Sequence, residues 1–133
     1  MPNNLRTKGQ VEALISEAII QFEKDYMGRG PTEAKTYLID NLVVIKLQGV
    51  LTPAERQLVS SAESDSGREL VKKMRHALLQ KGRPLLEALI KDLLGVGIRS
   101  LHTDLSTTTG ERVIIFSLES VPEIVERSHC ATE

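Results

Sequence analysis

The sequence predicts an α+β two-layer sandwich, in which helices cover one face of a four-stranded antiparallel sheet. Three observations predict it: a helical pattern near the start, two separate strand pairs with turn signals, and a long helical segment between the pairs. The resulting order is α-β-β-α-α-β-β, and hairpins separated by helices favour helices on one face of the sheet. We expect a single domain over residues 1–133, ordered from about residue 8 to 127 with a frayed C-terminal tail.

The first element is an amphipathic helix between about residues 8 and 25. Its polar side carries Glu12, Glu17 and Glu23, which we expect to stay in solvent. The apolar residues recur at spacings of three and four, as one helix face requires: Val11, Leu14, Ile15, Ala18, Ile19 and Phe22.

A glycine-rich corner follows at residues 26–31, with the sequence Tyr-Met-Gly-Arg-Gly-Pro. Gly28 can take the left-handed conformation that ends a helix, Gly30 can turn the chain again, and Pro31 blocks further helix. A phosphate-binding loop is the alternative, but such loops place their glycines before a helix, whereas a strand follows here. Arg29 keeps an anion-binding role open.

The first hairpin is predicted over residues 36–48. Asp40 and Asn41 suit a tight two-residue turn because both tolerate positive φ. In the second strand Val43, Ile45 and Leu47 alternate with polar residues, which indicates that one face of the sheet is at least partly in solvent.

Two helices are predicted between the hairpins. Thr52-Pro53-Ala54-Glu55 is a capping-box start for a short helix to about residue 60, and a polar loop is predicted over 61–67. A long helix from Arg68 to Leu94 should kink or break at Pro84. Its predicted core stripe is Leu70, Met74, Ala77, Leu78, Leu85, Leu89 and Leu93.

Beyond Pro84 the apolar arc of the long helix is wider than one packing face needs. A second packing partner is therefore indicated, and we predict a homodimer buried partly through Leu86, Ile90 and Leu94.

The second hairpin, over residues 96–118, carries most of the candidate binding residues. Its turn at 106–110 has four hydroxyl groups and a glycine, which can bind an oxyanion but are also ordinary turn chemistry. His102 and Asp104 share one strand face, where they either orient one another or simply face solvent. The candidate binding set is Arg29, His102, Asp104, Thr108, Thr109, Glu111 and Arg112. A short helix is expected at 122–127.

Composition excludes several classes of function. The net charge is −1, aromatic residues are 3% and Trp is absent, which disfavours a nucleic-acid partner. The single cysteine, Cys130, excludes an intrachain disulfide and a Cys-rich zinc site. No P-loop, dinucleotide fingerprint, zinc-protease pattern or nucleophile elbow occurs, so we expect no catalytic residues, metal or cofactor, and no enzyme activity. No apolar run is long enough for membrane insertion, and we expect a cytoplasmic protein.

Three stretches together carry a family resemblance: residues 26–55, 67–75 and 102–119. In this order they resemble the MpsC-like family, a bacterial family of unknown function named after a Na+-translocating, membrane-potential-generating system. The resemblance runs from about Gln10 to Glu119. It implies an accessory or regulatory subunit, peripheral to a membrane ion or bicarbonate transport system and associated with the membrane through a transport-protein partner. It brings no catalytic residues.

Two other functions stay open. The element order is similar to a type II KH domain, an RNA-binding fold, although the segment 61–67 has one glycine and two acids where that fold has its G-x-x-G loop. The basic residues of the long helix are interleaved with acids, which is typical of a solvated face. A small-anion or nucleotide sensor, using Arg29 and the turn at 106–112, is the other alternative.

Overall fold

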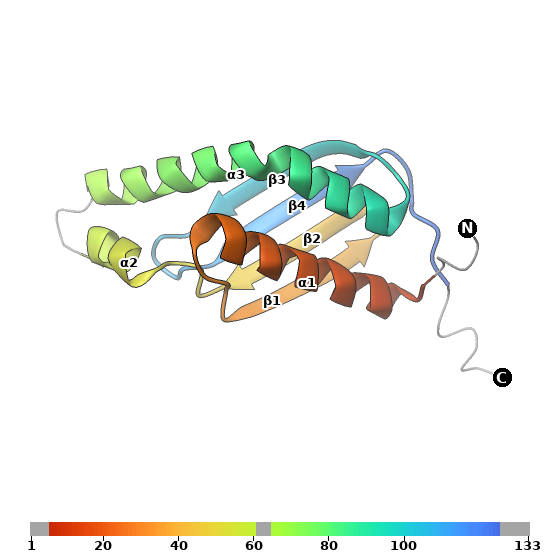
Figure 1. Cartoon of the computed structure of the whole chain (residues 1–133), viewed down its shortest axis with the longest axis horizontal. Coiled ribbons are helices and arrows are strands. Elements are labelled where there is room, and N and C mark those ends of the chain that lie inside the picture. The colour runs from red at the N-terminus through yellow and green to blue at the C-terminus, as the bar shows by residue number, and fades with distance from the viewer. Residues whose placement is uncertain (1–5, 61–64, 126–133) are drawn as a thin grey trace.

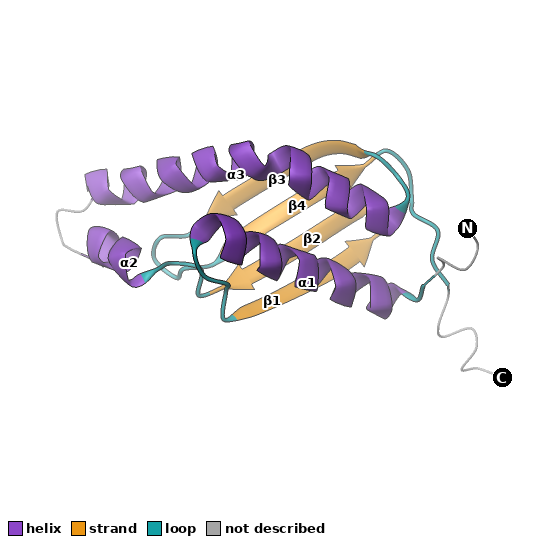
Figure 2. Cartoon of the chain, viewed as in Figure 1, coloured by secondary structure: helices purple, strands orange, loops and turns teal. Residues whose placement is uncertain are grey.

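The computed structural model describes residues 6–60 and 65–125 of the chain. Its strands form one antiparallel sheet in the order β1-β2-β4-β3, and α1 and α3 lie across one face of it (Figures 1 and 2). This confirms the predicted α+β fold and element order. The elements are α1 (Lys8–Met27), β1 (Glu33–Ile39), β2 (Leu42–Gln48), α2 (Pro53–Ser60), α3 (Asp65–Leu94), β3 (Ile98–Leu105) and β4 (Arg112–Leu118).

Helix α1 has a defined cap at each end. Thr7 and Gln10 form a capping box, and Gly28 closes the helix with φ of 90° while its N–H donates to the carbonyl of Lys24. The left-handed role of Gly28 is thus confirmed. Gly30 does not share it, because its φ is not positive, and it packs instead beside Ile20 and Lys24.

The first hairpin has the predicted two-residue turn, with Asp40 at φ of 53°. Pairing begins at Glu33 opposite Gln48, so β1 starts three residues earlier than predicted. Val43, Ile45 and Leu47 are fully buried beneath the helices, as their alternation indicated.

Helix α3 is longer and more continuous than predicted. It begins at Asp65, so residues 65–67 are helical and only 61–64 of the expected loop remain, outside the described residues. It also continues through Pro84, and the predicted break is wrong. Pro84 lacks the N–H that would bond the carbonyl of Gln80. Both residues are exposed, so water can satisfy that carbonyl.

The buried face of α3 is rotated from the predicted one. Leu70, Met74 and Leu85 are 55%, 43% and 47% exposed. Gly82 explains the rotation, since a Cβ there would lie 2.6 Å from the ring of Phe22, so only glycine lets α1 approach so closely. The buried residues are Val71, Arg75, Leu79, Gly82, Leu86, Ile90 and Leu94.

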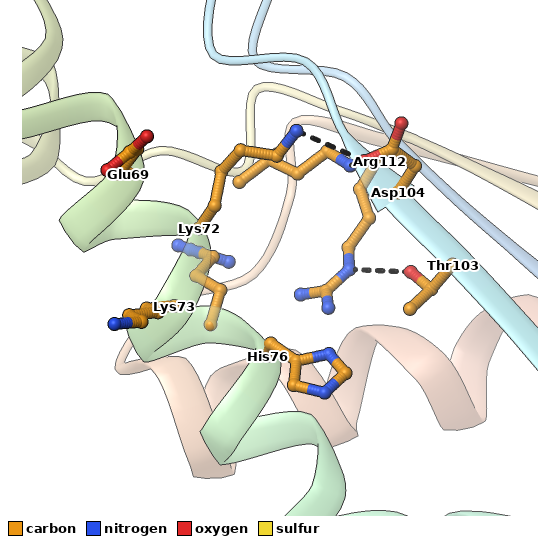
Figure 3. A pocket seen from close by; sticks show the side chains of 9 residues that line it. Glu69, Lys72, Lys73, His76, Thr103, Asp104 and Arg112 are labelled. Atoms are coloured by element: carbon orange, nitrogen blue, oxygen red, sulfur yellow. Dashed lines mark hydrogen bonds and ion pairs between the residues drawn. The ribbon is translucent and has the colours of Figure 1, made fainter. Parts of the chain in front are cut away.

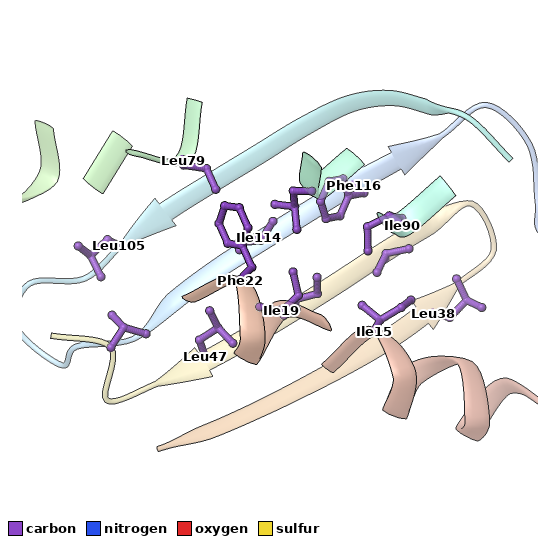
Figure 4. Packing of buried hydrophobic residues seen from close by; sticks show 14 of the residues in the cluster. Ile15, Ile19, Phe22, Leu38, Leu47, Leu79, Ile90, Leu105, Ile114 and Phe116 are labelled. Carbon is purple, nitrogen blue, oxygen red and sulfur yellow. The ribbon is translucent and has the colours of Figure 1, made fainter. Parts of the chain in front are cut away.

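This rotation places Leu86, Ile90 and Leu94 in the core of the monomer, and Figure 4 shows Ile90 packed among the other core side chains. They are therefore core residues, and the predicted dimer interface through them is wrong. The core also joins α1 to the inner faces of all four strands, through residues such as Ile15, Ile19, Phe22, Leu38, Leu105, Ile114 and Phe116.

The segment after β4 runs back toward the start of α1. Val125 forms a parallel bridge with Thr7, and its N–H donates to the carbonyl of Arg6. The described part of the predicted helix at 122–127 is therefore extended rather than helical.

Candidate functional site

The corner at 28–31 and the turn at 106–111 lie at the same end of the sheet. Leu47, near the end of β2, pairs with Arg112 at the start of β4, and the N–H of Val50 donates to the carbonyl of Gly110. Arg29 lies on the β1 side of this end, and the turn lies on the β3–β4 side. The candidate residues therefore divide into separate groups within one end of the molecule.

Hydroxyls of the turn hold the turn itself. Ser106 Oγ accepts from the N–H of Thr109, Thr109 Oγ1 accepts from the N–H of Glu111, and Gly110 has φ of 75°. The carboxylate of Glu111 lies 3.2 Å from Lys46 Nζ. Thr108 is exposed at the tip. These contacts account for the turn's composition without a ligand.

The outward face of β3 carries Ser100, His102 and Asp104 in a row. Ser100 Oγ lies 3.1 Å from His102 Nε2. Asp104 turns elsewhere: it accepts from the N–H of Leu105 and pairs with Lys72 Nζ of α3 at 3.3 Å. The hydrogen bond from the N–H of Leu105 lowers the pKa of Asp104, and the contact with Lys72 lowers it further. The row therefore does not have the Asp–His contact that orients a catalytic base.

Arg112 lies inside the protein, with 2% of its surface exposed, rather than on the surface of the turn. It belongs to a buried charge quartet, Glu23, Glu55, Arg75 and Arg112. Arg75 holds both carboxylate oxygens of Glu55, at 3.0 and 2.7 Å, and also contacts Glu23 Oε1 and the carbonyl of Val50. Arg75 is therefore the bonded centre of the quartet.

Arg112 is bonded far less completely. Its Nε donates to Thr103 Oγ1 at 3.2 Å. Its Nη1 lies 3.9 Å from Glu23 Oε2, and both of these buried atoms have no hydrogen-bond partner among the described residues. A buried guanidinium normally satisfies its donors, so this group has unused capacity.

The quartet shifts the pKa of its members in different directions. Burial raises the pKa of Glu23, and attraction to Arg112 and Arg75 offsets only part of this. Burial also acts to raise the pKa of Glu55, but hydrogen bonds from Arg75 and Thr52 outweigh it and leave the pKa lowered. Burial lowers the pKa of Arg112, and Glu23 opposes this.

A pocket of about 530 Å³ opens beside this quartet, between α3 and the β3–β4 hairpin (Figure 3). Arg112 and Thr103 form its strand side, and Lys72, Lys73 and His76 form its helix side. Glu69, Arg75, Asp104 and Leu105 complete the lining. Of the predicted binding residues, the structure brings Asp104 and Arg112 together here.

The face of the sheet opposite α1 and α3 is a second candidate surface, which we call the open face. Tyr37, Ile39 and Leu42 are 45%, 53% and 36% exposed on it. Register places its side chains in three rows across the strands: Lys35-Lys46-Val113-Asp104, Tyr37-Val44-Ile115-His102, and Ile39-Leu42-Ser117-Ser100. An apolar band thus runs across β1, β2 and β4.

The sequence did contain a signal for the buried quartet. Glu23 lies four residues after Ile19, and Arg75 lies midway between Val71 and Leu79, so both stand within apolar stripes. Glu23, expected in solvent, is in fact fully buried. The pocket lysines gave no comparable signal, because their exposure resembles that of any charged helix face.

Within residues 6–60 and 65–125, no group of three or more His, Cys, Asp or Glu side chains is placed to hold a metal ion. No helix of this described part is long and apolar enough to cross a membrane.

Two comparisons connect the chain to known proteins. Residues 7–120 match a family model described as "Na+-translocating membrane potential-generating system (MpsC)". The chain is also 41% identical over 113 residues to a protein of Bacillus subtilis (strain 168) named "Uncharacterized protein YbcI", covering 85% of this chain and 89% of that protein. No solved structure matches the chain.

Proposed function

The chain belongs to the MpsC family, and from that premise we propose that it is an accessory or regulatory subunit of a membrane ion-translocating system, with no turnover of its own. It acts on the cytoplasmic side and reaches the membrane through a protein partner. The observation that supports a binding role most directly is the open face, where a band of apolar side chains lies uncovered on the sheet of the single chain. Contiguous apolar surface of this kind is typical of protein–protein contact.

The contacts of the candidate polar groups support the proposed lack of turnover. Ser100 and His102 are hydrogen-bonded, but Asp104 faces Lys72 instead of the imidazole. The turn hydroxyls at Ser106 and Thr109 cap backbone N–H groups. A reaction centre needs a nucleophile, an activating base and an orienting group in contact with one another. Here Asp104 and the turn hydroxyls contact other groups instead.

A second copy of the chain is the partner that the open face fits best. One row, Lys35-Lys46-Val113-Asp104, carries basic residues on β1 and β2 and an acidic residue on β3, so this row is self-complementary. Self-complementarity is what a twofold interface requires. We therefore propose that the homodimer forms through the open face and not through α3.

The charges favour one twofold axis. An axis parallel to the strands lays β1 over β3 of the other copy, so Lys35 meets Asp104, and Val44 meets Ile115. An axis across the strands would place Lys35 over Ile39 and Lys46 over Leu42, burying two ammonium groups against apolar side chains. The strand-parallel axis avoids that cost and packs the two sheets face to face.

Disulfide crosslinking distinguishes these two arrangements. In a Cys130→Ser background, a chain with Val44→Cys mixed with a chain carrying Ile115→Cys should form a crosslinked heterodimer under mild oxidation. Val44→Cys alone should not crosslink. Efficient crosslinking of Val44→Cys with itself would contradict the strand-parallel axis.

The accessory role is tested by affinity capture from detergent-solubilised membranes of the native host. The natural chain should retain an integral membrane protein, and Tyr37→Glu, which places a carboxylate on the open face, should lose it if the dimer is the competent form. Leu70→Glu is the matched control, because Leu70 is similarly exposed but lies on α3. Capture of no membrane protein by the dimeric natural chain, or substrate turnover by the pure protein, would contradict the proposal.

A further inference from the structure

Arg112 occupies an unusual position for a buried cation. Its side chain reaches from the start of β4 into the wall of the pocket, where it faces His76 of α3 (Figure 3). Only 2% of the residue is exposed, yet Nη1 has no hydrogen-bond partner among the described residues. Burying a guanidinium donor without a hydrogen-bond acceptor costs free energy.

Glu23 does not resolve this cost. Its Oε2 is 3.9 Å from Nη1, beyond hydrogen-bond distance, and its Oε1 is already engaged by Arg75. Arg75 differs, since Glu55 and Val50 satisfy it closely. Both arginines line the pocket, and the unused donor capacity of the quartet is concentrated on Arg112.

The helix wall supplies more positive charge. Lys72 and Lys73 of α3 line the pocket beside His76, against the acids Glu69 and Asp104. Lys72 is held by Asp104 at 3.3 Å, with side chains 48% and 83% exposed. An ion pair so exposed contributes little stability, so Lys72 can exchange Asp104 for another anion at small cost.

We propose that this pocket binds a small organic oxyanion, a carboxylate or phosphate group, between Arg112 and Lys72. The oxyanion meets the guanidinium of Arg112 from the pocket side, and the buried Nη1 turns from Glu23 to donate to it. Lys72 leaves Asp104 to provide a second cation. Arginine suits both groups because its planar fork matches their oxygens. The volume of about 530 Å³ exceeds what a bare inorganic anion needs and lies in the range of metabolite sites, with Leu105 as an apolar contact for the rest of the ligand.

This site is separate from the proposed membrane role. Arg112 and Lys72, which hold the oxyanion, do not belong to the open face, and Asp104 alone is shared between the two surfaces. Ligand binding can be measured on the isolated protein whether or not it dimerises. Failure of either proposal therefore leaves the other intact.

Isothermal titration calorimetry with inorganic phosphate, citrate and AMP tests the site. We expect citrate or AMP to bind more tightly than inorganic phosphate, because both fill more of the pocket. Lys72→Gln should weaken that binding by about fivefold or more, the effect of losing one charged hydrogen bond. Lys81→Gln is the matched control on the same helix, and it should bind as the natural chain does. Backbone NMR shifts should change at Thr103, Leu105 and Arg112.

Arg112→Lys tests the fork directly, since it keeps the charge and loses the planar donors. It should abolish binding while the chain remains folded by circular dichroism. If that variant does not fold, Lys72→Gln and the NMR shifts still decide the question. Absence of binding by all three probes at about 10 mM, where even millimolar affinity is detectable, would overturn the proposal. Equal weakening in Lys72→Gln and Lys81→Gln would also overturn it, because it would indicate general charge attraction.

Discussion

Arg75 shows how much depends on a single buried side chain. It bonds both oxygens of Glu55, one oxygen of Glu23 and the carbonyl of Val50, which connects α1, the start of α2 and the end of β2 to α3. Glu55 also completes the capping box with Thr52. Each of these partners is buried, and each loses a hydrogen bond if the arginine is removed.

We predict that Arg75→Ala lowers the free energy of unfolding by about 3–5 kcal/mol, because two carboxylates would remain buried without their cation. Chemical denaturation measures this. Arg83→Ala is the control, since Arg83 pairs with Glu87 at a half-exposed site and should cost about 0.5 kcal/mol or less. Equal losses in the two variants would contradict the structural role of Arg75.

Glu23 should give stability a distinctive pH dependence. In the folded protein the pKa of Glu23 is raised above the ordinary value of 4.5. As pH rises above 4.5, the unfolded chain releases this proton before the folded chain does, so the folded state loses stability. Glu23→Gln cannot ionise. We therefore predict that the stability of Glu23→Gln relative to the natural chain increases as pH rises from about 4.5, by about 1.4 kcal/mol for each unit of pKa difference.

Denaturation at several pH values checks this prediction. Glu55 affects stability in the opposite direction, because its lowered pKa gives stability that is lost on acidification. Both chains contain Glu55, so its effect largely cancels when the unfolding free energies of Glu23→Gln and the natural chain are subtracted. A pH-independent difference, or one that falls as pH rises, would show that Glu23 is not held with a raised pKa.

Glycine positions could be predicted only in part from the sequence. Gly28 was identifiable as a helix end because a strand pattern follows it, and its φ of 90° agrees. Nothing in the local sequence distinguished Gly30 from Gly28, and nothing marked Gly82 as a contact site, because that role depends on a helix distant in the sequence.

At the scale of elements, the crossing of α1 and α3 depends on Gly82. A Cβ there would lie 2.6 Å from Phe22 and 3.1 Å from Tyr26, two rings that stack on one another. Gly82→Ala should therefore destabilise the protein by about 1–3 kcal/mol, although alanine favours a helix. Gly9→Ala in α1 is the control, since nothing lies within 4 Å of a Cβ there, and it should be neutral or slightly stabilising. Thermal melts of both variants compare the two effects.

Pro84 provides the opposite case in α3. The helix continues through it, and the residue is exposed, so its ring makes no core contact that must be kept. Pro84→Ala restores an N–H that can bond the carbonyl of Gln80, and should stabilise the protein by about 1–3 kcal/mol. A loss of stability in denaturant titrations would mean that the proline has a packing role.

The face that α3 buries could not be read from its periodicity alone. Leu70, Met74 and Leu85 form an apolar stripe as regular as that of Val71, Leu79 and Leu86. Packing against α1 decided between them, because only the second stripe brings Gly82 to Phe22. The hairpins and caps were predictable because their signals are local, such as the turn at Asp40 and the capping box at Thr52.

At the scale of the whole molecule, one face of the sheet is covered and the other is open. The α1–α3 layer buries the inner rows of side chains, while Tyr37, Ile39 and Leu42 remain exposed on the outside. Alternation along β2 predicted that the two faces differ, but only the strand order β1-β2-β4-β3 placed the basic and acidic residues on opposite sides of the open face. That order cannot be derived from the sequence of hairpins.

The molecular mass in solution, measured by sedimentation equilibrium at micromolar concentration, tests most directly the claim that the protein works through its open face. The natural chain should have twice the 14.7 kDa mass of one chain. Leu70→Glu should keep that mass, and Tyr37→Glu should give folded monomer, because it removes an aromatic ring from the interface and requires a carboxylate to lose its water there. A monomer mass for the natural chain, or an unchanged dimer in Tyr37→Glu, would contradict the account.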